Sequence, residues 1–195
     1  MPIRGALTLT AGLAAAPTPI LAQAAVTIPP YSVIGVASSD WNGDGVADRA
    51  ILAEGEEGSA DLYVYLSAPA QHDNRRRELA LLKRSAAWDG GVIGQQPSIE
   101  VNPKGSILLR SGNDSIGRNR WKQTIAIAYR GNRFVVAGVT YSWSDALDPS
   151  ASGDCDLNLL TGRGTRNGKR VDVGAQTILL SDWTDERRPR QCRSE

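Results

Sequence analysis

The sequence predicts an all-β fold, mostly antiparallel and arranged as a meander or a sandwich. Short runs of alternating apolar and polar residues recur at close spacing, and turns rich in Gly, Asn and Pro separate them. The chain lacks the strand–helix–strand rhythm of a parallel sheet, and it contains neither a P-loop nor another nucleotide-binding glycine loop. Both observations favour strands joined by hairpins.

The expected strands follow one another along most of the chain. They are 50–53, 61–67, 98–101, 106–110, 120–130, 133–143, 156–163, 169–174 and 175–180. Gly131-Asn132 is expected as a two-residue hairpin turn. NPKG, at 102–105, and GTRNG, at 164–168, are expected as two further turns.

Two segments depart from this pattern. QHDNRRRELALLKR, at 71–84, has a helical spacing of apolar residues, so one short helix is expected there. Leu79, Leu82 and Ala86 would line its apolar side. The tail after residue 180 shows no regular pattern, and we expect it to be irregular and held mainly by its cysteine.

The first 24 residues have the features of a cleaved export signal. One positive charge precedes an apolar Ala/Leu/Thr-rich run, and Ala22-Gln23-Ala24 has the small-x-small pattern that signal peptidase cuts. A buried helix or a membrane anchor is the alternative, but Pro17 and Pro19 would interrupt a helix. We therefore expect a signal peptide at 1–24 and a single β-rich domain at 25–195, periplasmic or secreted. No segment of that domain is apolar and long enough to span a membrane.

The charges of the mature chain balance. The sequence has 22 Lys and Arg against 21 Asp and Glu, and loss of Arg4 with the signal removes the difference. A neutral chain has no overall field to attract nucleic acid, which is therefore not an expected partner. Basic residues gather at 75–77, 118–122 and 187–193, where a solvated surface is the simplest interpretation.

Cys155 and Cys192 are the only cysteines. In an exported protein, two cysteines most simply form one disulfide, which here would tie the tail back to the domain. The alternative is a nucleophilic Cys155, which would need the only histidine, His72, as its partner.

The stretch SDWNGDGVADRA, at 39–50, carries the clearest chemical signal. Oxygen-bearing side chains occupy alternating positions of a short loop that also contains Gly45. They are Asp40, Asn42, Asp44 and Asp48. Ca²⁺ takes about 6–8 oxygen ligands, and the carbonyl of Val46 would add one more. The loop contains no Cys or His, which disfavours zinc and copper, and Mg²⁺ prefers to keep its own waters.

DWNGDGVAD resembles the calcium loop of FG-GAP and VCBS repeats, in which D-x-N-x-D-G-x-x-D links two strands. The resemblance implies the same four side-chain ligands, with Val46 binding through its carbonyl. An EF-hand matches less well, because its twelfth position needs an acid and here is Ile51. One copy does not make a propeller, so the chain resembles small exported bacterial β domains with a single loop of this type. A turn that binds nothing is the alternative interpretation.

These features predict an exported, calcium-binding, non-catalytic β module that interacts with an envelope component or another protein. The expected role of calcium is structural, and an ion that bridges to a ligand is the alternative. A carbohydrate-binding module is the second hypothesis, because five Trp and five Tyr supply flat faces with polar tips. Tyr141 and Trp143 would share one face of a strand, although packing is the simpler explanation for them. A small glycan hydrolase that uses the acids of 145–156 is the third.

Overall fold

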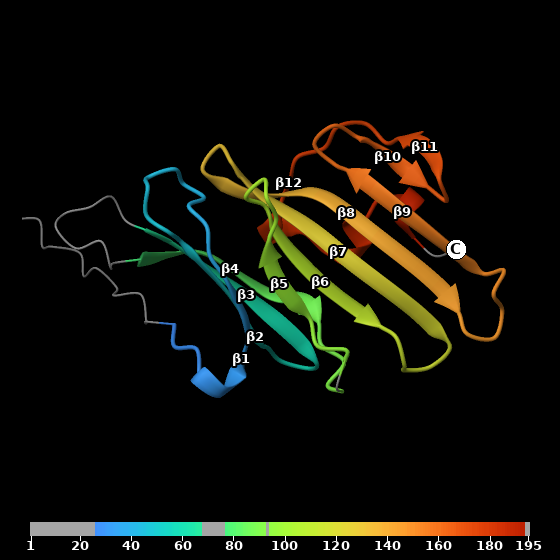
Figure 1. Ribbon diagram of the computed structural model, residues 1–195, viewed down its shortest axis with the longest axis horizontal. Helices are drawn as coiled ribbons and strands as arrows, with labels where there is room; N and C mark the ends of the chain where they lie inside the picture. Colours follow the sequence, from blue (N-terminus) through green and yellow to red (C-terminus); the bar gives the residue numbers. More distant parts are fainter. Residues whose placement is uncertain (1–25, 68–76, 93, 194–195) are drawn as a thin grey trace, which may run out of the picture.

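The computed structural model describes residues 26–67, 77–92 and 94–193 (Figure 1). Within these residues the strands are β1 (Val33–Ala37), β2 (Arg49–Glu54), β3 (Ser59–Ser67), β4 (Arg77–Trp88), β5 (Ser98–Val101), β6 (Ile107–Asn113), β7 (Asn119–Arg130), β8 (Arg133–Asp145), β9 (Ser152–Asn158), β10 (Arg163–Arg166), β11 (Lys169–Asp172) and β12 (Ile178–Leu179). Short 3-10 turns are η1 (Pro30–Ser32), η2 (Leu180–Asp182), η3 (Asp185–Arg187) and η4 (Arg190–Cys192). All strand pairs are antiparallel, which confirms the all-β prediction.

Strands β1 to β4 form a small sheet in chain order. β3 is its most buried strand, and the side chains of Leu62 and Val64 are fully buried. The predicted strands 50–53 and 61–67 correspond to β2 and β3. Backbone groups of a buried strand need hydrogen bonds on both edges, because an unpaired buried group is costly. β2 and β4 supply these bonds to β3.

The prediction of a helix over 71–84 is wrong for the part of this segment that the structure describes. Residues 77–84 belong to β4, where Leu82 lies opposite Tyr63 and Leu79 opposite Tyr65 of β3. The β3–β4 ladder contains register shifts, and Ser85 has a φ of 47°, so the alternation of apolar residues along β4 is disturbed. The resulting apolar spacing imitates a helix, but pairing with β3 outweighs it. Residues 71–76 lie outside the described residues.

The other strands form a larger sheet in the order β11-β10-β9-β8-β7-β6-β5. β12 pairs with β8 beyond the end of β9. β7 and β8 meet at Gly131-Asn132, whose φ values of 54° and 60° suit a two-residue hairpin turn. The predicted hairpin is therefore confirmed.

The bounds predicted for the next hairpin are wrong. The expected strand 156–163 is divided, since β9 ends at Asn158 and β10 begins at Arg163. The expected turn 164–168 is mostly strand, because Arg163–Arg166 pairs on both sides. The turn itself narrows to Asn167-Gly168, with φ values of 48° and 72° that match the twist of the strands it joins.

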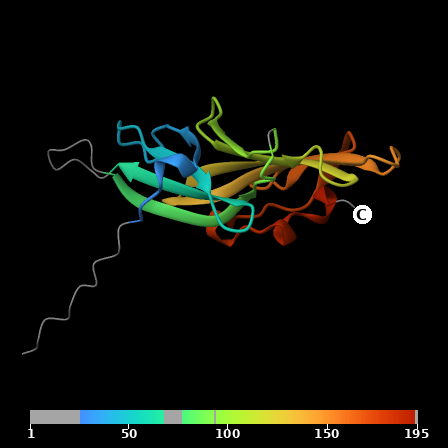
Figure 2. The ribbon, with the colours of Figure 1, turned by 90° about the horizontal axis from the view of Figure 1, so that it is seen from below.

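One apolar core connects the two sheets and the C-terminal tail. Leu62 of the small sheet and Ile127 and Leu157 of the large sheet are buried in it, and the tail adds Leu180 and Trp183. Figure 2 shows the tail, in red, along one face of the large sheet. The tail is less irregular than the sequence suggests, because it contains η2, η3 and η4.

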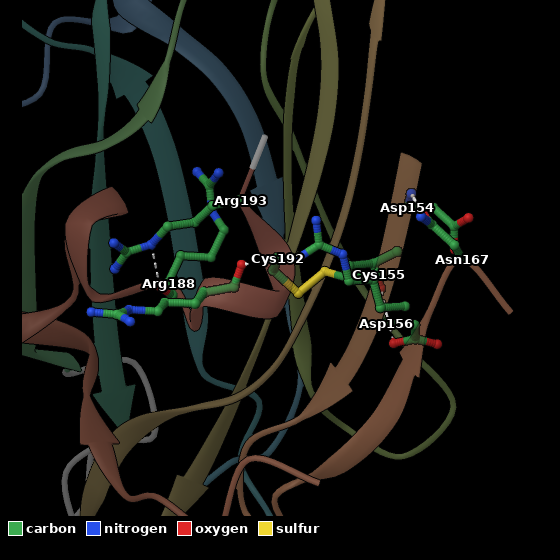
Figure 3. Close-up of a disulfide and its surroundings, with 10 residues drawn as sticks. Asp154, Cys155, Asp156, Asn167, Arg188, Cys192 and Arg193 are labelled. Carbon is green, nitrogen blue, oxygen red and sulfur yellow. Dashed lines mark hydrogen bonds between the residues drawn. A yellow bond between two sulfur atoms is a disulfide. The ribbon is translucent and has the colours of Figure 1, made fainter. Parts of the chain in front are cut away.

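A disulfide attaches the tail to the sheet, as predicted (Figure 3). It joins Cys155 of β9 to Cys192 of η4, with Cα atoms 5.3 Å apart, and both cysteines are fully buried. The sulfur of Cys155 is therefore not available as a nucleophile, and His72 lies outside the described residues.

In the part of the chain described above, no helix is both long and apolar enough to cross a bilayer. The predicted signal peptide, 1–24, lies outside the described residues.

Replacing both cysteines, Cys155→Ala with Cys192→Ala, should lower the free energy of unfolding by about 3–4 kcal/mol, the loop-closure value for this length of chain. Urea unfolding followed by circular dichroism measures the change. The single variant Cys192→Ala should lose as much stability, because either change removes the link. A loss below about 1 kcal/mol would contradict a stabilising role for this loop closure.

Candidate functional site

The loop between β1 and β2 contains the predicted calcium ligands. Gly43 and Gly45 have φ values of 77° and 85°, which glycine adopts without steric cost. The Asp40 carboxylate accepts hydrogen bonds from three backbone N–H groups. The distances are 2.7 Å from Gly43, 3.1 Å from Asp44 and 2.9 Å from Gly45. This carboxylate therefore closes the loop upon itself.

Asp48 anchors the loop to the end of β3. Its side chain is fully buried, and Oδ1 accepts hydrogen bonds from the backbone N–H and the hydroxyl of Ser67 at 2.7 and 3.0 Å. The hydroxyl of Ser67 also lies 2.6 Å from Oδ2 of Asp44, and this contact is the main cause that lowers the pKa of Asp44. A hydroxyl has one proton, so it donates to only one of the two carboxylates at a time.

Asn42 and Val46 complete the predicted ligand set. The Asn42 side chain donates to Asp44 Oδ2 at 3.0 Å and accepts from the Asp44 N–H at 3.1 Å. The Val46 N–H donates to Asp44 Oδ1 at 2.8 Å. Within the described ranges, no three His, Cys, Asp or Glu side chains form a group that could hold a metal ion. Asp40, Asp44 and Asp48 therefore do not form such a group by themselves, and the predicted ligand set also includes the Asn42 amide and the Val46 carbonyl.

A second candidate site is a row of four aromatic rings, which we call the aromatic row: Trp88, Trp121, Tyr141 and Trp143. Successive ring centroids are 5.6, 6.3 and 5.8 Å apart, and the last two pairs are stacked at 28° and 24°. The register of β7 and β8 places Trp121 opposite Trp143, so Trp121, Tyr141 and Trp143 share one face of the large sheet. Trp88, at the end of β4 in the small sheet, extends the row. The three Trp rings are half-buried and Tyr141 is buried.

One end of the aromatic row forms the floor of a larger cavity of about 710 Å³. This cavity lies where β7 and β9 begin and β8 ends, beside the turn between β10 and β11. Trp121, Tyr141 and Trp143 line it together with Arg120 and Arg166. Arg166 lies over the Trp143 ring, 5.4 Å from its centroid.

The other end of the row borders a smaller cavity of about 400 Å³, which Trp88 and Trp121 line. Gln123 of β7 and Trp183 of the tail also line it. Within the described part of the chain, Gln123 Oε1 and Trp183 Nε1 are buried without a hydrogen-bond partner. An acceptor and a donor therefore remain unsatisfied beside the same cavity.

The tail covers the middle of the row. The Arg188 guanidinium lies 4.0 Å from the centroid of Tyr141, a cation–π geometry. Its Nη2 is 2.9 Å from Asp185 Oδ1. Figure 3 shows Arg188 on the same tail segment as Cys192, so the disulfide and the cation–π contact both attach this segment to the sheet.

The acids proposed for a hydrolase do not meet in one cleft. Asp145 is the one carboxylate among the described residues that line the larger cavity. It pairs with Arg118 at 2.6 Å, and the hydrogen bond from that guanidinium lowers its pKa. Asp148 accepts hydrogen bonds from Ser150 within its own loop. Asp156 lies 3.2 Å from the hydroxyl of Thr140.

Reasoning from the sequence found only two members of the row, Tyr141 and Trp143. Trp121 lies opposite Trp143 because a register shift between Ala126 and Ile127 follows the turn at Gly131-Asn132. The turn by itself would place Trp121 opposite Ser142, so the hairpin signal could not have identified this pair. Arg188 comes from the tail, where no local pattern indicates a partner.

Comparison of the chain with known proteins finds no matching family model, no matching curated protein and no matching solved structure.

The Trp143 ring lies against Gly153 of the neighbouring strand. A Cβ built on Gly153 would lie 2.3 Å from Cζ2 of Trp143 and 2.8 Å from Oδ1 of Asn167. Gly153→Ala should therefore displace the indole and destabilise the fold by about 1–3 kcal/mol. Tryptophan fluorescence and thermal unfolding measure both effects. Ser152→Ala, one residue earlier and exposed, is the control, and equal behaviour of the two variants would contradict the predicted contact.

Proposed function

We propose that this protein is an exported, calcium-binding, non-catalytic β module that interacts with an envelope component or another protein. The observation that carries the proposal is the gathering of Asp40, Asp44 and Asp48 on one loop without a basic side chain to neutralise them. Among the described residues, no ion pair involves any of these carboxylates.

The basic residues near the loop bind elsewhere. Arg77 donates to the backbone carbonyl of Ala47 at 2.7 and 3.0 Å. Arg49 donates to the carbonyl of Asp48 at 3.0 Å and also contacts Ser38. Among the described residues, the carboxylates of the loop have hydrogen bonds but no ion-pair partner. A hard divalent cation is the chemical species that would supply an opposite charge.

The ligand set suits calcium. Carboxylate, amide and carbonyl oxygens are its preferred ligands, whereas zinc and copper prefer the nitrogen and sulfur that the loop lacks. Asp44 and Asp48 share the hydroxyl of Ser67 at 2.6 and 3.0 Å. An ion bound by both would fasten the loop to the end of β3, which is a structural role.

A non-catalytic role is supported by the state of the cleft acid. Asp145 in the larger cavity is paired with Arg118, and its lowered pKa keeps it ionised. General acid catalysis of glycoside hydrolysis needs a carboxyl with a raised pKa and a second carboxylate close by.

Excess Ca²⁺ should raise the melting temperature of the oxidised protein relative to the protein with chelator. At 100 times the dissociation constant the stabilisation should reach about 2.7 kcal/mol. Mg²⁺ at the same concentration should stabilise less, because it retains its waters. Differential scanning calorimetry measures the shifts, and isothermal titration calorimetry measures the binding.

Asp44→Ala should abolish the calcium-dependent shift. Asp114→Ala is the matched control, because it removes an exposed aspartate that pairs only with Lys122, at 3.3 Å. Absence of both a shift and calorimetric binding in the unmodified protein, with the fold intact, would reject the loop as a calcium site.

A further inference from the structure

We propose that the aromatic row binds an acidic linear oligosaccharide that contains uronate units. Pyranose rings place their C–H faces on flat aromatic side chains, and Trp and Tyr combine such faces with a polar tip. In the larger cavity, half-buried Trp121 and Trp143 offer these surfaces to solvent. The side chains of Asn119, Ser144 and Asn167 line the same cavity and can bind hydroxyl groups.

The charge of the larger cavity selects an anionic ligand. Arg120 lines it, and its acid, Asp145, is paired with Arg118. Among the described residues, the Nη1 atom of Arg120 is buried without a hydrogen-bond partner. A guanidinium recognises a carboxylate through two parallel hydrogen bonds. A uronate carboxylate therefore matches this wall of the cavity.

The smaller cavity enlarges the proposed binding site so that it can hold more than one sugar unit. Trp121 lines both cavities. A ligand that occupies both cavities would therefore contact this ring. In the smaller cavity, Trp183 Nε1 lacks an acceptor and Gln123 Oε1 lacks a donor, within the described ranges. A hydroxyl both accepts and donates, so sugar hydroxyls have the chemistry to satisfy either atom. An oligosaccharide therefore fits this arrangement better than a monosaccharide does.

A single-stranded nucleic acid is the competing ligand, since its bases stack on aromatic rings and its phosphates bind arginine. The unpaired donor and acceptor of the smaller cavity, together with the amide and hydroxyl side chains of the larger one, favour a ligand rich in hydroxyl groups. The aromatic row is separate from the calcium loop, whose ligands lie between β1 and β2 of the small sheet.

The test titrates the calcium-saturated protein with a hexasaccharide of alternating glucuronate and N-acetylglucosamine. Tryptophan fluorescence and isothermal titration calorimetry report binding. The same hexasaccharide with its carboxylates reduced to alcohols should bind about tenfold or more weakly. Added salt should weaken binding of the acidic form. The corresponding disaccharide should also bind more weakly, because it cannot reach both cavities.

Trp143→Ala and Arg120→Gln should each weaken binding of the acidic hexasaccharide about tenfold. Tyr31→Ala is the control, because Tyr31 is an exposed aromatic residue outside the row, 87% accessible. Circular dichroism and melting confirm that each variant is folded. The unmodified protein, folded and titrated in the presence of chelator, should bind the hexasaccharide as the calcium-saturated protein does, so failure of the calcium proposal is distinguishable from failure of this one.

Three results would overturn the proposal. Absence of binding by the folded protein rejects the row as a saccharide site. Equal affinity for the acidic and the carboxyl-reduced hexasaccharides rejects the acidic class. Tighter binding of a thymidine hexanucleotide than of the acidic hexasaccharide assigns the row to nucleic acid instead.

Discussion

The ladder between β7 and β8 is the interaction on which the rest of the structure depends. Its turn and a register shift between Ala126 and Ile127 together place Ile125 opposite Val139 in the core and Trp121 opposite Trp143 in the aromatic row. A slip of one residue would move these side chains to the other face of the sheet. β6 pairs with β7, and β9 and β12 pair with β8. These three strands are therefore aligned by direct pairing with one of the two strands of this ladder.

The C-terminal tail covers part of the apolar face of the sheet that contains β7 and β8. An antiparallel sheet needs a cover on its apolar face, and the small sheet shares the core with only part of the larger one. Leu180 and Trp183 extend that cover along the tail, and Arg188 places its charge over Tyr141. The disulfide at Cys192 secures the end of this segment. The tail thus closes the core and also covers Tyr141 of the aromatic row.

In the loop between β1 and β2, a charged side chain rather than an apolar one is buried, that of Asp48. Burying an ionised carboxylate costs free energy unless hydrogen bonds or opposite charge compensate. Asp48 is compensated by N–H groups of Trp41 and Ser67 and by the hydroxyl of Ser67. Hydrogen bonds between polar groups therefore join the loop to β3, whereas the neighbouring elements are joined by apolar packing. The same acidic group supports the calcium proposal, because its hydrogen bonds leave its charge unpaired.

The sequence by itself determined the features that depend on neighbouring residues. Alternation predicted β3, and Gly131-Asn132 predicted the central hairpin, because side-chain period and turn conformation are local properties. Counting cysteines was enough to predict their pairing. Tertiary structure alone decided that 77–84 is a strand, because its edge pairs with a distant buried strand. It also decided that Ser67 would contact Asp48 and that Arg188 would cover Tyr141. The alternation of apolar and polar residues along a strand shows which face a side chain occupies, but it does not show which distant segment will pack on that face.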